Sequence, residues 1–213
     1  MPKSVPSSRA DRQPPHDAAP VVDRIVAEGR RLFFAHGFRA VTMDDVAAHL
    51  GMSKKTLYAS FPSKLALVEA VILRKFADVE AELRRVADES IDDVPAGLRQ
   101  TLAALQRHVS ELQPPFLRDV GKPGSELFRL MNARRSEVIQ RHFSTMLERG
   151  RRAGVIRRDV PAQFVLQVLL AAVQGVLTPQ NLAEMGLTPT EGVAAIVSLF
   201  LEGVLTEKGR AQT

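Results

Sequence analysis

The chain has no cysteine and no tryptophan, and one tyrosine among its 213 residues. The absence of cysteine excludes disulfides, thiolate metal sites and a cysteine nucleophile, and it fits a reducing cytoplasm. No stretch approaches the roughly 18 consecutive apolar residues that a membrane-spanning helix needs. The first 20 residues also lack the apolar segment of a secretion signal. We therefore expect a cytoplasmic protein that does not enter a membrane.

Residue groups that carry catalysis are also missing. No two of the histidines are spaced to bind one metal ion from a single helix, and the carboxylates mostly stand at expected helix starts, where capping and the helix dipole explain them. The histidines are His16, His36, His49, His108 and His142. The sequence therefore predicts no catalytic residue, no metal site and no cofactor. A small helical enzyme is a rival hypothesis that no residue constellation supports.

What the chain does contain is a capped unit between residues 42 and 67. Thr42 followed by Asp45 is the Ser/Thr-x-x-acid pattern of a helix N-terminus. Gly51 stands where that helix must end with a positive φ. Ser53 is then placed to cap a second, short helix, and Ser63 a third. The first of these helices carries apolar residues on one face at Met43, Val46, Ala47 and Leu50.

The second helix of this unit contains no acidic residue. Leu57 and Phe61 stand at an i, i+4 spacing and are expected to face inward. The opposite face presents Lys54, Lys55, Thr56, Tyr58 and Ser60. Two helices joined by a short turn that contains glycine form the DNA-reading helix-turn-helix unit. A phosphate backbone can approach such a helix without electrostatic repulsion.

The segment GMSKKTLYASFPSKLAL, residues 51–67, resembles the DNA-binding signature of the TetR family of bacterial transcriptional regulators. The matching positions are Gly51, Met52, Ser53, Leu57, Tyr58, Phe61, Lys64 and Leu67. One position departs from the pattern, because Ser60 stands where the family usually has His or Tyr. The similarity is strong from about residue 22 to residue 71, and the rest of the chain resembles the family in its helix pattern alone.

The resemblance, together with helix position, implies a role for each exposed residue. Thr42 and Ser53 donate hydrogen bonds to DNA phosphates from helix N-termini, and Tyr58 and Lys64 hold phosphates beside the groove, with Ser60 in the position of a further contact. The side chains placed to reach base edges are Lys54, Lys55 and Thr56. Lysine to guanine is the natural pairing among them. The expected partner is double-stranded DNA with a palindromic operator, which places the protein at the nucleoid.

The distribution of charge and the helical pattern indicate how the chain is divided into parts. Net charge is +5, and residues 21–75 hold nine basic and five acidic residues. We expect an all-α protein of about nine helices, with a three-helix DNA-binding head at residues 21–66 and a helical effector-binding and dimerisation body at residues 67–208. A disordered arm at residues 1–20 and a short tail at residues 209–213 flank them. The arm carries Lys3, Arg9 and Arg12, which either trail along DNA or stay in solvent.

Within the body, local signals set the expected helix limits. A long helix is expected from Ser63 to about Ser90, and another from Glu126 to about Ala153. Residues 116–125 are expected to be irregular, after a break at residues 113–115. Asp159 is expected to cap the helix that follows, with Pro161 in its first turn. The second long helix carries two basic clusters, which are interpreted as a solvated face rather than as a second nucleic-acid site; they are Arg134 with Arg135, and Arg149 with Arg151 and Arg152.

Two later helices, at residues 164–177 and about 189–205, are apolar on nearly every side. A helix of that kind must be buried all round, and a body of this size has too little interior to bury two. We therefore predict that one face of each meets a second copy of the chain, in a seam of four helices. The predicted interface residues are Phe164, Val168, Ala171, Ala172, Gly175, Ala195, Leu199 and Gly203. A monomer with two central helices is the alternative.

The resemblance also implies a ligand cavity in the body. Its candidate lining residues are Phe116, Met131, Met146 and Gln174, with His108 as a polar anchor. The effector is expected to be a small, hydrophobic molecule. The sequence thus predicts a ligand-responsive transcriptional regulator, by family default a repressor released by its effector. The alternative is a helical, ligand-binding dimer that never touches DNA.

Overall fold

The computed structural model describes residues 18–91 and 93–211, and the described chain is all-α. The helices of this part are α1 (Ala18–His36), α2 (Met43–Leu50), α3 (Lys54–Ser60), α4 (Lys64–Glu89), α5 (Val94–Ser110), α6 (Pro114–Val120), α7 (Glu126–Ala153), α8 (Ala162–Val176), α9 (Pro179–Glu184), α10 (Pro189–Val204) and α11 (Glu207–Arg210). The β-type pairing among the described residues is one isolated bridge between Ile156 and Leu205. The predicted fold class is confirmed.

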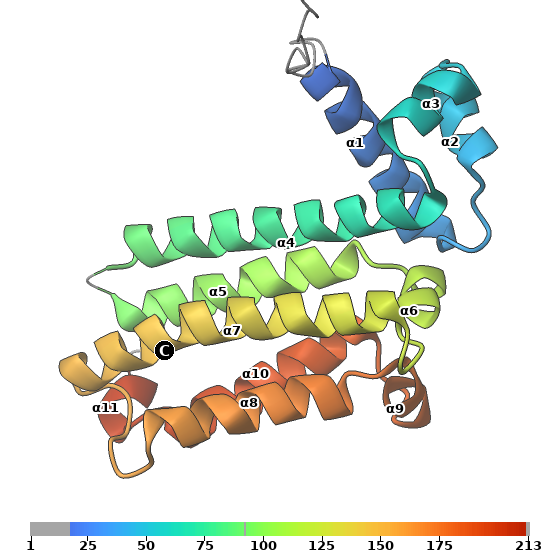
Figure 1. Ribbon diagram of the computed structural model, residues 1–213. Coiled ribbons are helices and arrows are strands. Elements are labelled where there is room, and N and C mark those ends of the chain that lie inside the picture. Colours follow the sequence, from blue (N-terminus) through green and yellow to red (C-terminus); the bar gives the residue numbers. More distant parts are fainter. Residues whose placement is uncertain (1–17, 92, 212–213) are drawn as a thin grey trace, which may run out of the picture.

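Helices α1–α3 form a small unit, here called the head, that stands above one end of α4 (Figure 1). Phe33, Val46 and Leu57 are fully buried where the three helices meet. Further apolar residues of the head are buried or half-buried around them; with these three, the set is Phe33, Phe34, Phe38, Val41, Val46, Leu50, Leu57 and Phe61. The same cluster continues into the start of α4 and reaches Phe116 and Met131.

The head's helix ends follow the sequence signals. The Thr42 hydroxyl accepts from the Asp45 N–H, and the Asp45 carboxylate accepts from the Thr42 N–H, which completes a capping box. Gly51 has φ of 62° and lies in the left-handed region, as the turn requires. The hydroxyls of Ser53 and Ser63 cap α3 and α4 by accepting N–H groups three residues further on. These predicted caps and the predicted glycine turn are therefore present.

The remaining helices, α4–α11, make up the body. Helices α4, α5, α7, α8 and α10 run along a common direction in stacked layers, with α8 and α10 on the side away from the head (Figure 1). α4 packs on α1 at one end and on α5 and α7 along its length. The single helix α4 thus connects the head to the body.

Several predicted limits are corrected. The described residues form eleven helices, not about nine. Pro114 and Pro115 end α5 but also open α6, because proline is well tolerated in the first turn of a helix. The region predicted to be irregular is therefore helical to Val120. Pro179 opens the short helix α9 in the same manner. Helix α1 begins at Ala18, and residues 1–17, which hold most of the predicted arm, lie outside the described residues.

Two further corrections concern the end of the body. Asp159 does not cap α8; its carboxylate pairs with the Arg157 guanidinium, which lowers the pKa of Asp159 to about 2. The N-cap residue of α8 is Pro161, whose side chain makes no capping hydrogen bond. The tail predicted from residue 209 begins inside α11, where Gly209 is buried. Asp159 lies too far before the first turn of α8 to cap it. Its carboxylate therefore binds Arg157, two residues away, instead of a backbone N–H of the helix.

Candidate nucleic-acid interface and effector cavity

Helix α3 turns most of its side chains to solvent. Leu57 is fully buried and anchors it, while Lys54, Lys55, Thr56 and Tyr58 are exposed, Tyr58 by 46%. The N-caps Thr42 and Ser53 are also exposed at the starts of α2 and α3. The structure therefore brings together, on one accessible surface, four cationic or hydroxyl-bearing side chains and two helix N-termini. Such an arrangement suits a polyanion.

Local contacts already occupy some of these groups. Lys54 Nζ lies 2.6 Å from Asp44 Oδ2, between two exposed side chains. Surface ion pairs of this kind contribute little stability, so a phosphate or a base can take the place of Asp44. The Ser53 and Thr56 hydroxyls lie 2.9 Å apart, and the Ser60 hydroxyl donates to the Thr56 carbonyl at 3.4 Å. Ser60 thus points along its own helix.

Lys64 lies at the first turn of α4 and is half-buried. Its ammonium donates to the Val41 carbonyl at 3.0 Å and to the Arg39 carbonyl at 3.4 Å. These bonds tie α4 to the segment that leads into α2, a role that the sequence did not reveal. An ammonium has three donors, so a third N–H can still reach a phosphate.

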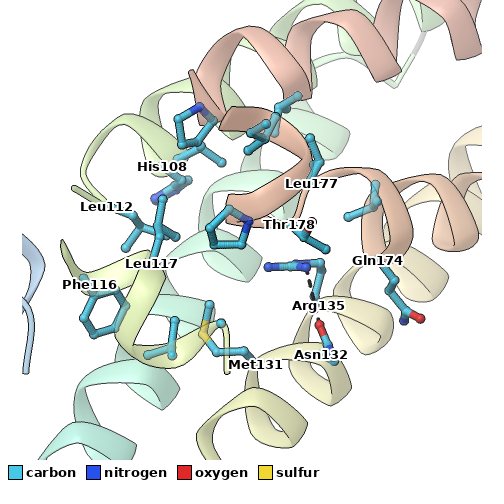
Figure 2. A pocket seen from close by; sticks show the side chains of 18 of the residues that line it. His108, Leu112, Phe116, Leu117, Met131, Asn132, Arg135, Gln174, Leu177 and Thr178 are labelled. Atoms are coloured by element: carbon cyan, nitrogen blue, oxygen red, sulfur yellow. Dashed lines mark hydrogen bonds between the residues drawn. The ribbon is translucent and has the colours of Figure 1, made fainter. Parts of the chain in front are cut away.

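The body contains a partly open cavity of about 1010 Å³, bordered by α4–α10. His108, Phe116, Met131 and Gln174 all line it, so the structure brings four of the five candidate ligand residues together (Figure 2). Met146 does not line this cavity; it borders a separate pocket of about 230 Å³ near His142. Met146 lies about one turn beyond Phe143, the last α7 residue on the wall of the large cavity.

His108 belongs to a buried network between α4 and α5. Its Nδ1 lies 2.8 Å from Lys75 Nζ, and its Nε2 lies 2.8 Å from Glu82 Oε2. Lys75 Nζ is also 2.9 Å from Glu111 Oε2. Burial lowers the pKa of both Lys75 and His108, and the Lys75 charge lowers that of His108 further. The imidazole is then neutral and accepts from Lys75 through Nδ1, while its Nε2 faces the Glu82 carboxylate. His108 thus supports the cavity wall.

The interpretation of Arg135 as a solvated residue is wrong. Its guanidinium reaches into the middle of the cavity, between Met131 on one side and Leu177 and Thr178 on the other (Figure 2). Its nearest acceptor is Asn132 Oδ1 at 3.4 Å. Burial lowers the pKa of Arg135. The neighbouring Arg134 pairs instead with Glu137. No signal in the sequence distinguishes these two adjacent arginines.

Helix α6 joins the cavity to the head. The rings of Phe116, on the cavity wall, and Phe34, in α1, have centroids 4.7 Å apart. The Gln113 N–H donates to the Phe34 carbonyl at 3.2 Å. The Asp119 carboxylate accepts from the Arg39 N–H at 2.9 Å. A displacement of α6 by a ligand would therefore be transmitted directly to α1.

The predicted interface residues lie on one outer face of α8 and α10, which pack on each other. Leu199 is 76% exposed, Phe164 61% and Val168 49%. Gly175 and Gly203 have open space where a side chain would be. Ala171 and Ala195 are exposed and Ala172 is half-buried. The face is apolar and carries small residues that allow another backbone to approach.

Among residues 18–91 and 93–211, no group of three or more His, Asp or Glu side chains is arranged to hold a metal ion. No single helix in this part of the chain is long and apolar enough to cross a membrane; the bent pair α3–α4 meets that test jointly, by length and composition.

The chain is similar to known bacterial regulatory proteins. A model of bacterial regulatory proteins of the tetR family matches residues 25–71. The chain is 28% identical over 188 residues to the uncharacterized HTH-type transcriptional regulator YvaF of Bacillus subtilis, covering 87% of this chain and 96% of that protein. It is 23% identical over 164 residues to the HTH-type transcriptional repressor DhaR of Mycobacterium sp., covering 74% and 81%.

Solved structures share the whole architecture. A putative transcriptional regulator from Saccharomonospora viridis, in complex with choline, superposes with a TM-score of 0.65 at 20% identity, over 89% of this chain and 100% of that one. A putative TetR-family regulator from Mesorhizobium loti gives 0.66 at 18% identity, over 90% and 100%. The capped turn and the outward α3 lie inside the segment that the family model matches, so residues 25–71 form the DNA-binding segment of the tetR family of bacterial regulatory proteins.

Proposed function

We propose that the protein is a repressor that binds a near-palindromic operator as a homodimer and is released by a small, largely apolar effector. The observation that carries the proposal is α3, a capped and acid-free helix with exposed Lys55 and Tyr58. A relative named as a repressor supports the sign of regulation. A protein with this role acts in the cytoplasm at the nucleoid and needs no catalytic residue.

In this proposal, the contacts divide by their function. Thr42, Ser53, Tyr58 and Lys64 hold phosphates, which set register and salt dependence. Lys54, Lys55 and Thr56 face base edges in the major groove and set sequence preference. Ser60, bonded within its own helix, contributes least. Two copies of α3 about 34–36 Å apart would read half-sites separated by one DNA turn.

Dimerisation through α8 and α10 would supply that spacing. Substituting Leu199 with Asp places a charge in the centre of the exposed face and should give monomers in analytical ultracentrifugation. Ile91→Asp is the matched control, because Ile91 is also exposed, by 57%, but lies outside this face. If both variants remain dimeric, the second copy is bound elsewhere.

Effector release follows from the contacts of α6. A ligand that pushes Phe116 moves the ring against Phe34 and shifts α1, and with it the distance between the two heads. The effector lowers DNA affinity only by the difference between its affinities for the two arrangements. The choline of the Saccharomonospora viridis structure is not transferred to this chain, because the described residues that line this cavity include five cationic side chains and no carboxylate.

The decisive experiment measures binding of the full chain to the DNA that flanks its own coding region, by fluorescence anisotropy, with a random duplex as reference. Lys55→Ala should weaken operator binding by about tenfold or more and affect the random duplex less. Lys64→Ala should weaken both equally. Arg152→Ala removes one exposed charge at the far end of α7 and serves as control.

The alternative, a ligand-binding helical dimer without DNA binding, predicts a different result. Wild-type protein would then bind neither the flanking DNA nor any duplex selected from a random pool. Measurements at low salt concentration separate weak binding from absent binding. Contacts to phosphates make the affinity for DNA fall steeply as salt is added, so weak binding becomes detectable when the salt is reduced.

A further inference from the structure

The effector cavity has an asymmetric set of charges. Its lining includes no Asp and no Glu among the described residues. The cationic lining residues are Arg39, Lys75, Arg118, Lys122 and Arg135. Most of the other lining side chains are apolar and come from α4–α10. A molecule inside this cavity therefore meets hydrocarbon and positive charge, and no carboxylate.

Arg135 differs from the other cations in its surroundings. Lys75 is held by Glu111, and Arg39 lies 3.6 Å from Asp119. Arg118 and Lys122 are exposed to solvent near the end of α6. Arg135 makes one long hydrogen bond, to Asn132, and no ion pair with any residue in the described part of the chain. It is thus a half-buried cation on the cavity wall that has no counter-ion among the described residues.

An unbalanced charge in apolar surroundings is unfavourable, and an incoming anion removes that cost. Burial alone lowers the pKa of Arg135, with no contribution from a neighbouring charge. Arginine nevertheless stays protonated in proteins. Its planar fork of N–H donors matches the two oxygens of a carboxylate, and such bidentate pairs are the strong ones.

We propose that the effector is a carboxylic acid with an apolar body, whose carboxylate pairs with Arg135 while the body fills the hydrophobic remainder of the cavity. This inference rests on the proposed function, because it names the chemical class of the same effector. One unbalanced cation calls for one negative charge, and the cavity of about 1010 Å³ accommodates an apolar part much larger than the head group. The same pairing fixes the ligand next to Met131, one turn of α7 from Arg135, and close to Phe116 (Figure 2).

The test uses four probes with one ten-carbon tail and different heads. Decanoate is the carboxylate, decanamide is its neutral counterpart, decyltrimethylammonium reverses the charge and decyl phosphate offers a different anion. Binding to the full-length protein is measured by isothermal titration calorimetry, independently of DNA. Decanoate should bind about ten- to a hundredfold more tightly than decanamide, and decyltrimethylammonium should not bind detectably.

Variants of two adjacent arginines assign the effect to one side chain. Arg135→Gln should remove the preference for decanoate over decanamide, and Arg135→Lys should restore part of it. Arg134→Gln removes the same charge from the neighbouring position, which pairs with Glu137, and should leave the preference intact. Unchanged decanamide binding in Arg135→Gln shows that the cavity still folds.

The outcomes separate this inference from the proposed function. If decanamide binds as well as decanoate, if decyl phosphate binds more tightly than decanoate, or if no probe binds, the carboxylate assignment is overturned. Operator binding by the protein without ligand is unaffected by any of these results, and it stands or falls by the anisotropy experiment. Release of the operator by decanoate, in wild type but not in Arg135→Gln, would support both.

Discussion

The head and the body differ in how densely their side chains are packed. In the head, the side chains of Phe33, Val46 and Leu57 are fully buried in one continuous cluster. In the body, buried residues fall into several smaller clusters around a cavity of about 1010 Å³. A densely packed unit holds its surface in one arrangement, whereas a hollow one can repack around a ligand. The head therefore has the fixed surface that recognition of a partner requires, and the body has room to adapt around a bound molecule.

Truncation of a leucine should cost more in the head than at the cavity wall. Leu57→Ala leaves a void in a closed core and should lower the free energy of unfolding by about 2–5 kcal/mol. Leu105→Ala should cost less than about 2 kcal/mol, because Leu105 already borders empty space and has lost contacts on that side. Urea unfolding followed by circular dichroism, at one protein concentration, measures both. Equal losses would contradict the difference in packing.

The junction between head and body can be tested at Gly37. This residue has φ of +82°, and a Cβ added there would lie 2.7 Å from Asp119 Oδ2 and 3.2 Å from the Pro115 carbonyl carbon. Gly37→Ala should therefore destabilise by about 2–4 kcal/mol, from backbone strain and crowding together. Because the crowding pushes α6 from α1, it should also reduce DNA affinity.

A glycine in the body supplies the control for that variant. Gly186 has φ of +66° but no atom within 4 Å of an added Cβ. Gly186→Ala should cost about 1 kcal/mol from backbone strain alone and leave DNA affinity unchanged. Similar losses in the two variants would mean that α6 does not press on the head.

Removing the unbalanced charge from the cavity should stabilise the protein without ligand. Arg135→Met replaces a half-buried cation with an apolar side chain of similar length, and a gain of about 1 kcal/mol would raise Tm by about 2–4 °C in a chain of this size. Differential scanning calorimetry measures the shift. Arg134→Met, which breaks an ion pair with Glu137, should not raise Tm. A lower Tm for Arg135→Met would reveal a structural role for its charge.

Stability should fall as pH drops from about 7 towards 5.5. The pKa of His108 is lowered by burial and by Lys75, and that of His142 by burial and by Arg141 and Arg84. Between the lowered pKa values and the ordinary value of about 6.5, the unfolded chain binds more protons than the folded one. Acidification in that window therefore favours unfolding.

His108→Gln should reduce this pH dependence, because glutamine offers Lys75 an acceptor but does not titrate. Urea midpoints at about pH 7.5, 6.5 and 5.5 provide the measurement. His49→Gln, at an exposed site on α2, is the control. An unchanged slope in His108→Gln would show that the network does not couple folding to this histidine. We expect this change in pH dependence to be smaller than the effects of the leucine, Gly37 and Arg135 substitutions.

Sequence alone was sufficient for the head. The capping box at Thr42 and Asp45, the left-handed Gly51 and the cap at Ser53 depend on residues within three or four positions of one another. Local hydrogen bonds and backbone sterics decide such features. The same kind of signal also predicted α4 and the end of α7 near Ala153 correctly. Periodicity also identified the faces of α8 and α10 that are exposed in one chain.

Only the tertiary structure decided what each face of the body meets. Arg134 and Arg135 are neighbours with the same chemistry, yet one pairs with Glu137 and the other enters the cavity. His108 looked like a ligand anchor, but α4 supplies the Lys75 and Glu82 that engage it. The cavity wall combines helices from α4 to α10, which are distant in sequence. Local spacing determines where a helix begins and ends, whereas the balance of a buried charge depends on which distant helices pack around it.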